Sequence, residues 1–249
     1  MNMQLMLGIG ILCYFISLFL ICFYKEKINT KLFNAVFIIL DMIGLLCWYI
    51  SYAENGWLDD GFITLDNISP FTFTLIPLTV FMNEKTKEYA YSTIAFLHAG
   101  MFIATLVSPE YVVIFNYKTE ATFAYACEAV CHIICSLFGI YLILTKQVRA
   151  DFNHWVKSIV FMLSVITFGV ALNLILDTHC FNMNPNQYSI YMIDIFGTFE
   201  ATLIAYYLGI IVVLTLGMQV GGALNKLVEK LRIQYKAYKI VHSRTTGDI

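Results

Sequence analysis

Two ionisable side chains inside an apolar segment give this sequence its clearest chemistry. Glu128 and His132 are four residues apart, so on a helix they share one face and can hydrogen-bond or form an ion pair. A carboxylate beside an imidazole holds the ring in one tautomer and raises its basicity, as a general base requires. The same pair would serve equally as a proton relay or as an anchor for a ligand.

Other polar residues also fall within or at the ends of apolar segments, where an unpaired ionisable group costs about 2.5 kcal/mol or more. These residues are Asp41, Thr72, Thr74, His98, Asn173, Asp177 and Glu200. By depth, the two threonines, Asn173 and Glu200 fall in the same outer half as the Glu128/His132 pair. We expect a polar cavity there, open toward the outer leaflet.

Each of these residues taken alone also has a purely structural explanation. Asp41 could hydrogen-bond a neighbouring helix, His98 could be a satisfied packing histidine, and threonines in membrane helices commonly bond their own backbone. For the Glu128/His132 pair we favour a functional role, because two ionisable groups on one face of one segment are hard to explain as packing.

The elements that must position these residues are seven apolar segments, most of them near the twenty residues that a helix needs to cross a bilayer. They run over Leu5–Phe23, Leu32–Tyr52, Asp66–Met82, Tyr89–Val107, Thr122–Leu144, Val156–Leu176 and Thr198–Val220. The pattern predicts an all-α, polytopic membrane protein with seven transmembrane helices.

The positive charges predict how these segments are oriented. All of the 15 Lys and Arg residues except Lys118 fall in alternate gaps, after the first, third and fifth segments, at the start of the sixth, and in the tail. Because basic residues concentrate on the cytoplasmic side, the N-terminus is expected outside and the C-terminus inside. The expected location is the cell membrane, and the residue usage suits a bacterial protein.

Composition excludes several other classes of protein. With 59% hydrophobic and 13% charged residues, the chain cannot be a soluble globule. Its cations form a collar beside lipid headgroups, so no nucleic-acid partner is expected. The seven cysteines show neither a disulfide framework nor metal-ligand spacing, and we expect no metal or cofactor. The last segment has no lysine to hold retinal.

After Gly221 the sequence changes character. Leucines, Val228 and two tyrosines recur at helical spacing among lysines and arginines, which predicts a basic amphipathic helix suited to the inner leaflet. A solvated extension of the last segment is the alternative. We therefore divide the chain into a transmembrane domain over residues 1–222 and a cytoplasmic amphipathic tail over 223–249.

Several short stretches resemble the YwaF-like integral membrane proteins. Pro70-Phe71-Thr72-Phe73-Thr74 stands where that family carries Pro-Leu-His-Leu-Cys, and Ser108-Pro109-Glu110-Tyr111 is similar to its Pro-Asp/Glu turn. His132 lies at the position of the family's histidine in the fifth helix. The stretch from Asn173 to His179 looks like the family's Asn-x-x-x-Gly-Thr-Asn, with Asp177 and His179 replacing its Gly and final Asn.

The resemblance implies a seven-helix protein whose eukaryotic relatives include lipid acyltransferases that use a cysteine of the third helix and a histidine of the fifth. Thr74 takes the cysteine position here and Thr72 that of the preceding histidine. Thr/His pairs are also seen in the androgen-induced membrane lipid hydrolases. A threonine becomes a nucleophile only beside a base. Our first hypothesis is therefore lipid-acyl transfer or hydrolysis, with Thr74 as nucleophile, His132 as base and Glu128 orienting it.

Two alternatives stay open. In the first, the same cavity binds or transports a small polar or amphiphilic molecule, or a lipid, without chemistry, and Thr72, His98, Asp41, Asn173, Asp177 and Glu200 line it. In the second, the protein is a structural subunit whose outer polar residues satisfy one another. Membrane lipids are the expected partners in every case, whereas the sequence does not specify a protein partner.

Overall fold

The computed structural model describes residues 3–54, 68–107, 122–178, 180–183 and 195–246, and over these residues the regular structure is helical throughout. The α-helices are α1 (Met3–Tyr24), α2 (Thr30–Glu54), α3 (Ile68–Leu78), α4 (Glu84–Val107), α6 (Thr122–Leu144), α7 (Phe152–Leu176) and α9 (Phe199–Thr246). Two short 3₁₀ turns, η2 (Thr79–Phe81) and η3 (Cys180–Asn182), follow α3 and α7.

These seven helices of the described chain coincide with the seven predicted segments. The bounds of α6 are those predicted, whereas α7 begins four residues early because Asp151 caps it: the Asp151 carboxylate accepts a hydrogen bond of 3.0 Å from the backbone N–H of His154. The all-α prediction is confirmed. Lys118, the exception to the charge pattern, lies outside the described residues.

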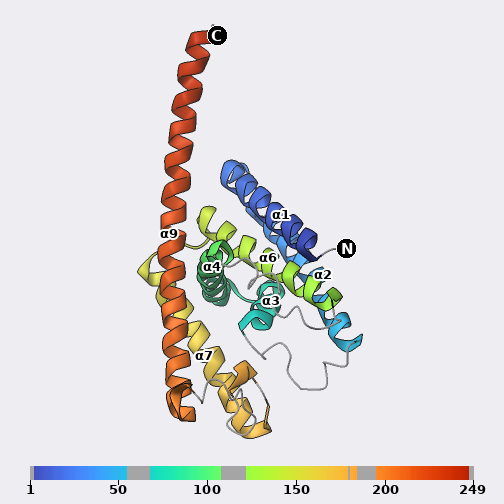
Figure 1. Ribbon diagram of the computed structural model, residues 1–249. Helices are drawn as coiled ribbons and strands as arrows, with labels where there is room; N and C mark the ends of the chain where they lie inside the picture. The colour runs from blue at the N-terminus through green and yellow to red at the C-terminus, as the bar shows by residue number, and fades with distance from the viewer. Residues whose placement is uncertain (1–2, 55–67, 108–121, 179, 184–194, 247–249) are drawn as a thin grey trace.

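The last helix does not end at Gly221 and Gly222, where the predicted transmembrane domain ends. α9 continues through both glycines as one helix of 48 residues, and its C-terminal part projects beyond the ends of the other helices (Figure 1). The tail is therefore helical and continuous with the last segment, whereas its predicted place at the inner leaflet stays a prediction.

Helices α4 and α6 form the interior of the bundle (Figure 1). α4 contacts α6, α7 and α9, while α6 contacts α1, α2, α3, α4 and α9. Every residue of α4 from 92 to 99 is buried, so all faces of that stretch are covered by other helices. Residues 92–99 of α4 and 135–144 of α6, all buried, are thus shielded from whatever surrounds the bundle.

The outer helices, in contrast, present large apolar side chains outward. Leu12 and Phe19 on α1, Leu46 on α2, Phe168 on α7 and Ile204 on α9 are about 60% exposed. Four helices of the described chain are long and apolar enough to cross a membrane, and they comprise α2, most of α6, α7 and the first part of α9. A polar interior helix surrounded by an apolar exterior is the arrangement of a multi-pass membrane protein.

Glycines allow the interior helices to approach closely. A Cβ atom at Gly217 of α9 would lie 1.7 Å from the Phe96 carbonyl oxygen of α4, and one at Gly139 of α6 would lie 2.7 Å from His98 Cβ. Gly221, one turn after Gly217, faces Ile143 of α6 at 2.5 Å. Small residues at such contacts let helix backbones meet, which is the main source of helix association in lipid.

The basic gaps meet at one end of the bundle, formed by residues 24–34, 83–91, 145–157 and 225–232, which we call the basic end. Lys25 after α1 pairs with Glu229 of α9 at 2.8 Å, and Arg232 forms a bidentate pair with Glu26. The Asn34 amide at the start of α2 donates to the Gln147 side chain between α6 and α7 at 2.9 Å. Lys146 between α6 and α7 also lies 4.0 Å from Glu229, and the Asn34 amide donates to the Tyr91 hydroxyl of α4 at 3.3 Å, so the gaps after the first and fifth segments lie beside the tail and near the first part of α4.

We expect Gly217→Ala to lower the stability of the protein by about 1–3 kcal/mol, because the added methyl forces α9 away from the α4 backbone. Gly209→Ala is the matched control on the same helix, since a Cβ there meets nothing within 4 Å. Thermal unfolding in detergent should show a lower midpoint for Gly217→Ala alone. Equal midpoints for the two variants would contradict the close α4–α9 contact.

Candidate functional site

A row of polar side chains runs along α6 through the interior of the bundle. Glu128, His132 and Ser136 succeed one another at intervals of four residues, and Cys131 and Cys135 do the same on the neighbouring face. Both cysteines, His132 and Ser136 are buried. The Ser136 hydroxyl hydrogen-bonds the Tyr14 hydroxyl of α1 at 2.9 Å, so one member of the row is fully accounted for by packing.

The predicted Glu128/His132 pair exists in the structure. His132 Nε2 lies 3.8 Å from Glu128 Oε1, which suits an ion pair rather than a hydrogen bond. The other ring nitrogen, His132 Nδ1, is buried and has no hydrogen-bond partner among the described residues. The ring of Phe73 on α3 meets the imidazole edge to face, with centroids 4.9 Å apart.

The two threonines of α3 bond their own helix. Thr74 Oγ1 donates to the Pro70 carbonyl at 3.0 Å, and Thr72 Oγ1 donates to the Ser69 carbonyl at 2.9 Å. Phe73, which lies between them, is the residue of this stretch that meets His132. The threonines thus show the backbone bonding that their structural explanation predicts.

Asp41 of α2 is fully buried against the second face of α6. Its Oδ1 accepts a weak hydrogen bond from the Cys135 thiol at 3.5 Å, while Oδ2 has no partner in the described chain. Two turns along α2, the indole N–H of Trp48 is also buried and unpaired. Trp48 was not among the predicted residues, although a tryptophan in a membrane interior raises the question of where its N–H is satisfied.

His98 of α4 lies where α4 and α6 meet at Gly139. It is 1% exposed, and neither ring nitrogen has a hydrogen-bond partner within the described residues. His98 is therefore buried, as a packing histidine would be, but its ring nitrogens lack hydrogen-bond partners among the described residues. A neutral imidazole carries one hydrogen-bond donor and one acceptor, so His98 has one of each without a partner in the described chain.

Asn173 uses its side chain to hold the turn after α7. Its Nδ2 donates to the Cys180 carbonyl at 2.9 Å, and its Oδ1 accepts from the Cys180 backbone N–H at 2.7 Å and from Thr178 Oγ1 at 2.9 Å. Asp177 ends α7 in the left-handed conformation with φ 53°. Glu200 is exposed in the first turn of α9. The hydrogen bonds of Asn173 thus go to the turn after α7 and not to the row on α6.

A second polar cluster, not found from the sequence, joins α4 to α7 at the basic end. Glu88 lies 2.5 Å from Lys157 Nζ and 3.5 Å from His154 Nε2, and His154 Nδ1 lies 2.8 Å from Asp151. Burial raises the pKa of Asp151, but hydrogen bonds from the backbone and ring of His154 outweigh it, so the pKa lies below its usual value. The cluster fixes the start of α7, and its members are paired.

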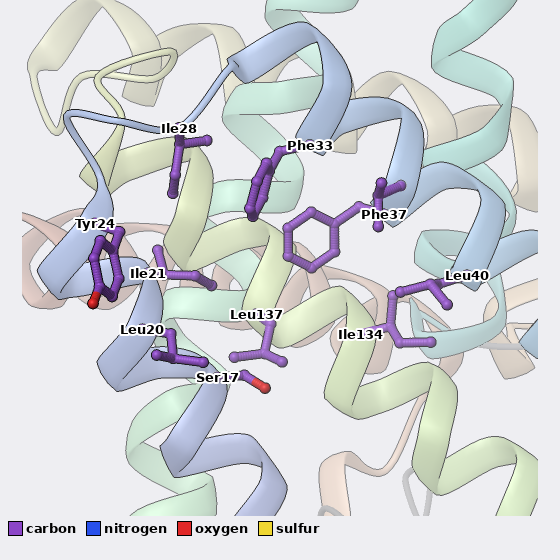
Figure 2. Close-up of a pocket in the computed structure, with 11 residues that line it drawn as sticks. Ser17, Leu20, Ile21, Tyr24, Ile28, Phe33, Phe37, Leu40, Ile134 and Leu137 are labelled. Carbon is purple, nitrogen blue, oxygen red and sulfur yellow. The ribbon is translucent and has the colours of Figure 1, made fainter.

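Two grooves on the bundle surface are apolar. One, of about 440 Å³, lies between α1, α2 and α6 (Figure 2), and the other, of about 520 Å³, lies between α1 and α9. Neither is lined by a predicted site residue.

Cys127 and Cys180 both carry free thiols, and the described residues contain no group of three or more potential metal ligands.

The chemistry of the interior therefore depends on a few unpaired atoms contributed by α2, α4 and α6. These are Asp41 Oδ2, Trp48 Nε1, His98 Nδ1 and Nε2, and His132 Nδ1. They include the Trp48 N–H donor, the Asp41 carboxylate oxygen, the His98 ring, which as a neutral imidazole offers one donor and one acceptor, and one nitrogen of the His132 ring. Such a set can bind a small polar molecule or exchange a proton with it.

No protein-family model, curated protein or solved structure matches this chain. The resemblance to YwaF-like proteins and the functions that it implies therefore stay predictions, to be judged on the residues and contacts described above.

We expect Asn173→Ala to destabilise the protein by about 1–3 kcal/mol, because it leaves the buried Cys180 N–H without an acceptor. Asn153→Ala, an exposed asparagine on the same helix, is the control and should leave the midpoint unchanged. Thermal unfolding in detergent measures both. If Asn173→Ala unfolded like the wild type yet lost a bound molecule, Asn173 would be a ligand-binding side chain, as first predicted.

Proposed function

We propose that the chain is a seven-span protein of the cell membrane, with its N-terminus outside and its C-terminus in the cytoplasm. Four long apolar helices and the exposed apolar side chains of the outer helices support its insertion in lipid. The gathering of basic residues at one end of the bundle supports the orientation, because such residues are retained in the cytoplasm. The projecting part of α9 then lies on the cytoplasmic side.

For the interior we propose non-catalytic binding of a small polar molecule, as a step in its uptake, export or sensing. The observation that carries this proposal is the set of buried, unpaired polar atoms on Asp41, Trp48, His98 and His132. Each such atom costs about 1–3 kcal/mol when nothing bonds it, and buried polar groups are normally satisfied. A bound molecule with both donors and acceptors would remove that cost.

Binding is favoured over catalysis by the contacts of Thr74. A threonine nucleophile needs its hydroxyl within hydrogen-bond reach of the base, whereas Thr74 donates to Pro70 and the ring of Phe73 lies against His132. Lipid-acyl transfer or hydrolysis by Thr74, His132 and Glu128 is the second candidate. It is supported by the 3.8 Å Glu128–His132 pair and by the adjacency of Thr74 to Phe73.

Native mass spectrometry of protein extracted in patches of its own membrane separates the two candidates. We expect a non-covalent small molecule on the wild type and on Thr74→Val, and its loss from Asp41→Ala and His132→Ala, because these two remove unpaired polar groups. Ser164→Ala, an exposed serine bonded to its own helix, is the control. An acyl adduct that disappears in Thr74→Val would instead establish the enzyme. A wild type with neither species would contradict both candidates and favour a structural subunit.

The orientation has its own test. A fluorescent protein that matures only in the cytoplasm, fused after Ile249, should be bright, and a periplasm-active phosphatase in the same place should be inactive, because the basic end stays inside. A phosphatase fused in frame after Glu54 should be active, since that end of α2 is expected outside. Activity of the phosphatase after Ile249 would reverse the proposed orientation.

A further inference from the structure

The groove between α1, α2 and α6 differs from the interior site in both chemistry and position. Its lining is almost entirely aliphatic and aromatic, with Phe33, Phe37 and Leu137 at its centre and Ser17 at one end (Figure 2). Its volume of about 440 Å³ falls within the range of about 300–1,000 Å³ that is usual for small-ligand sites.

The groove runs along α2 from Phe33 to Leu40, a rise of about 10 Å. At one end, Tyr24 and Ile28 line it where the chain turns from α1 into α2 (Figure 2). That turn is ordered by two backbone hydrogen bonds, from Lys27 N to the Tyr24 carbonyl at 2.8 Å and from Phe33 N to the Asn29 carbonyl at 2.9 Å. The groove is thus long and narrow, and it has one end at the basic end of the bundle.

The cations at this end fall into two classes. Lys25 and Arg232 are already neutralised by Glu229 and Glu26. Lys27 and Lys31, which stand on either side of Ile28 in the chain, are exposed, and no ion pair of the described residues involves either one. Two exposed lysines without an ion pair in the described chain therefore stand close in sequence to lining residues at this end of the groove: Lys27 precedes Ile28, and Lys31 lies two residues before Phe33.

We propose that this groove binds an anionic phospholipid, with one acyl chain between α1, α2 and α6 and the headgroup phosphate at Lys27 and Lys31. An acyl chain fits a lining that offers van der Waals contact along its length and few polar partners. The anionic headgroup fits the charge, because basic residues beside transmembrane helices on the cytoplasmic side recognise the anionic lipids of that leaflet. The groove between α1 and α9 has Arg232 in its lining, and that guanidinium is paired with Glu26.

This lipid site goes beyond the proposed function and requires only that the bundle lie in a bilayer. It would hold one lipid in place beside α6, on the side away from His98 and α4. Its occupancy does not depend on which molecule, if any, enters the polar interior.

The test uses the purified full chain in nanodiscs made of equal parts phosphatidylglycerol and phosphatidylcholine with identical acyl chains, followed by native mass spectrometry of the lipid retained. We expect the wild type to retain phosphatidylglycerol preferentially. Val36→Trp and Leu20→Trp fill the groove from two different helices, and each should reduce retention several-fold. Ile39→Trp is the matched control, because Ile39 is exposed on α2 but does not line the groove.

Neutralising pairs of lysines tests the recognition of the lipid headgroup separately. The double variant Lys27→Gln/Lys31→Gln should lower the preference for phosphatidylglycerol by about thirtyfold, the size expected for two lysines near an anionic surface, while Lys226→Gln/Lys230→Gln on α9 should keep it. Equal retention of the two lipids by the wild type, or equal losses with Ile39→Trp and both groove variants, would overturn the proposal. Because both faces of the nanodisc carry the same lipids, an error in the proposed orientation would not alter the result.

Discussion

The arrangement of the other helices depends on the need to cover the polar side chains of α6. Inside a bilayer neither water nor lipid can satisfy such groups, so neighbouring helices must do so. Tyr14 of α1 meets Ser136, and Asp41 of α2 meets Cys135. On a third side, the missing side chain of Gly139 lets α4 place His98 directly against the α6 backbone. These three interactions account for the contacts of α6 with α1, α2 and α4.

Close packing provides the rest of the stability. Lipid tails are as apolar as leucine, so hydrophobic burial gives little preference for helix contact over lipid contact, and helices must gain by fitting together. A Cβ atom at Gly217 would overlap the Phe96 backbone, and one at Gly100 would lie 3.4 Å from the Val213 carbonyl oxygen, so α4 and α9 each present a glycine to the other. One turn after Gly217, Gly221 of α9 packs against Ile143 of α6. The helix therefore continues through this glycine as part of the packed bundle.

Most of the fold was accessible from the sequence, because apolar segments of membrane length and alternating charge are strong signals. The seven segments became seven helices among the described residues. The change of composition after Gly222 does not coincide with a helix end, because α9 continues through both glycines and Gly221 packs against Ile143. Segment bounds such as the start of α7 depended on a local cap, which the run of apolar residues does not reveal.

The candidate site was only partly accessible. Glu128 and His132 are close because both lie on one helix, so their spacing alone fixed their proximity. The partners of Thr74 and Asn173 depend on where α3 and the turn after α7 lie, and a pattern along one segment carries no such information. Trp48 was missed for the same reason, since its indole matters only because α3 and α2 leave the N–H without an acceptor.

The unpaired atoms are informative because the rest of the polar chemistry is so fully used. Asn173 makes three hydrogen bonds, Thr72 and Thr74 return to their own helix, and Asn34 and Gln147 bond each other. Among the described residues one further buried polar atom has no partner, Asn225 Oδ1 at the basic end, and the other such atoms belong to Asp41, Trp48, His98 and His132. Apolar residues at the positions of Asp41 and His98 would avoid the free-energy cost of burying polar groups without hydrogen bonds. Their presence at the contacts of α2 and α4 with α6 is the observation on which the proposed binding of a small polar molecule rests.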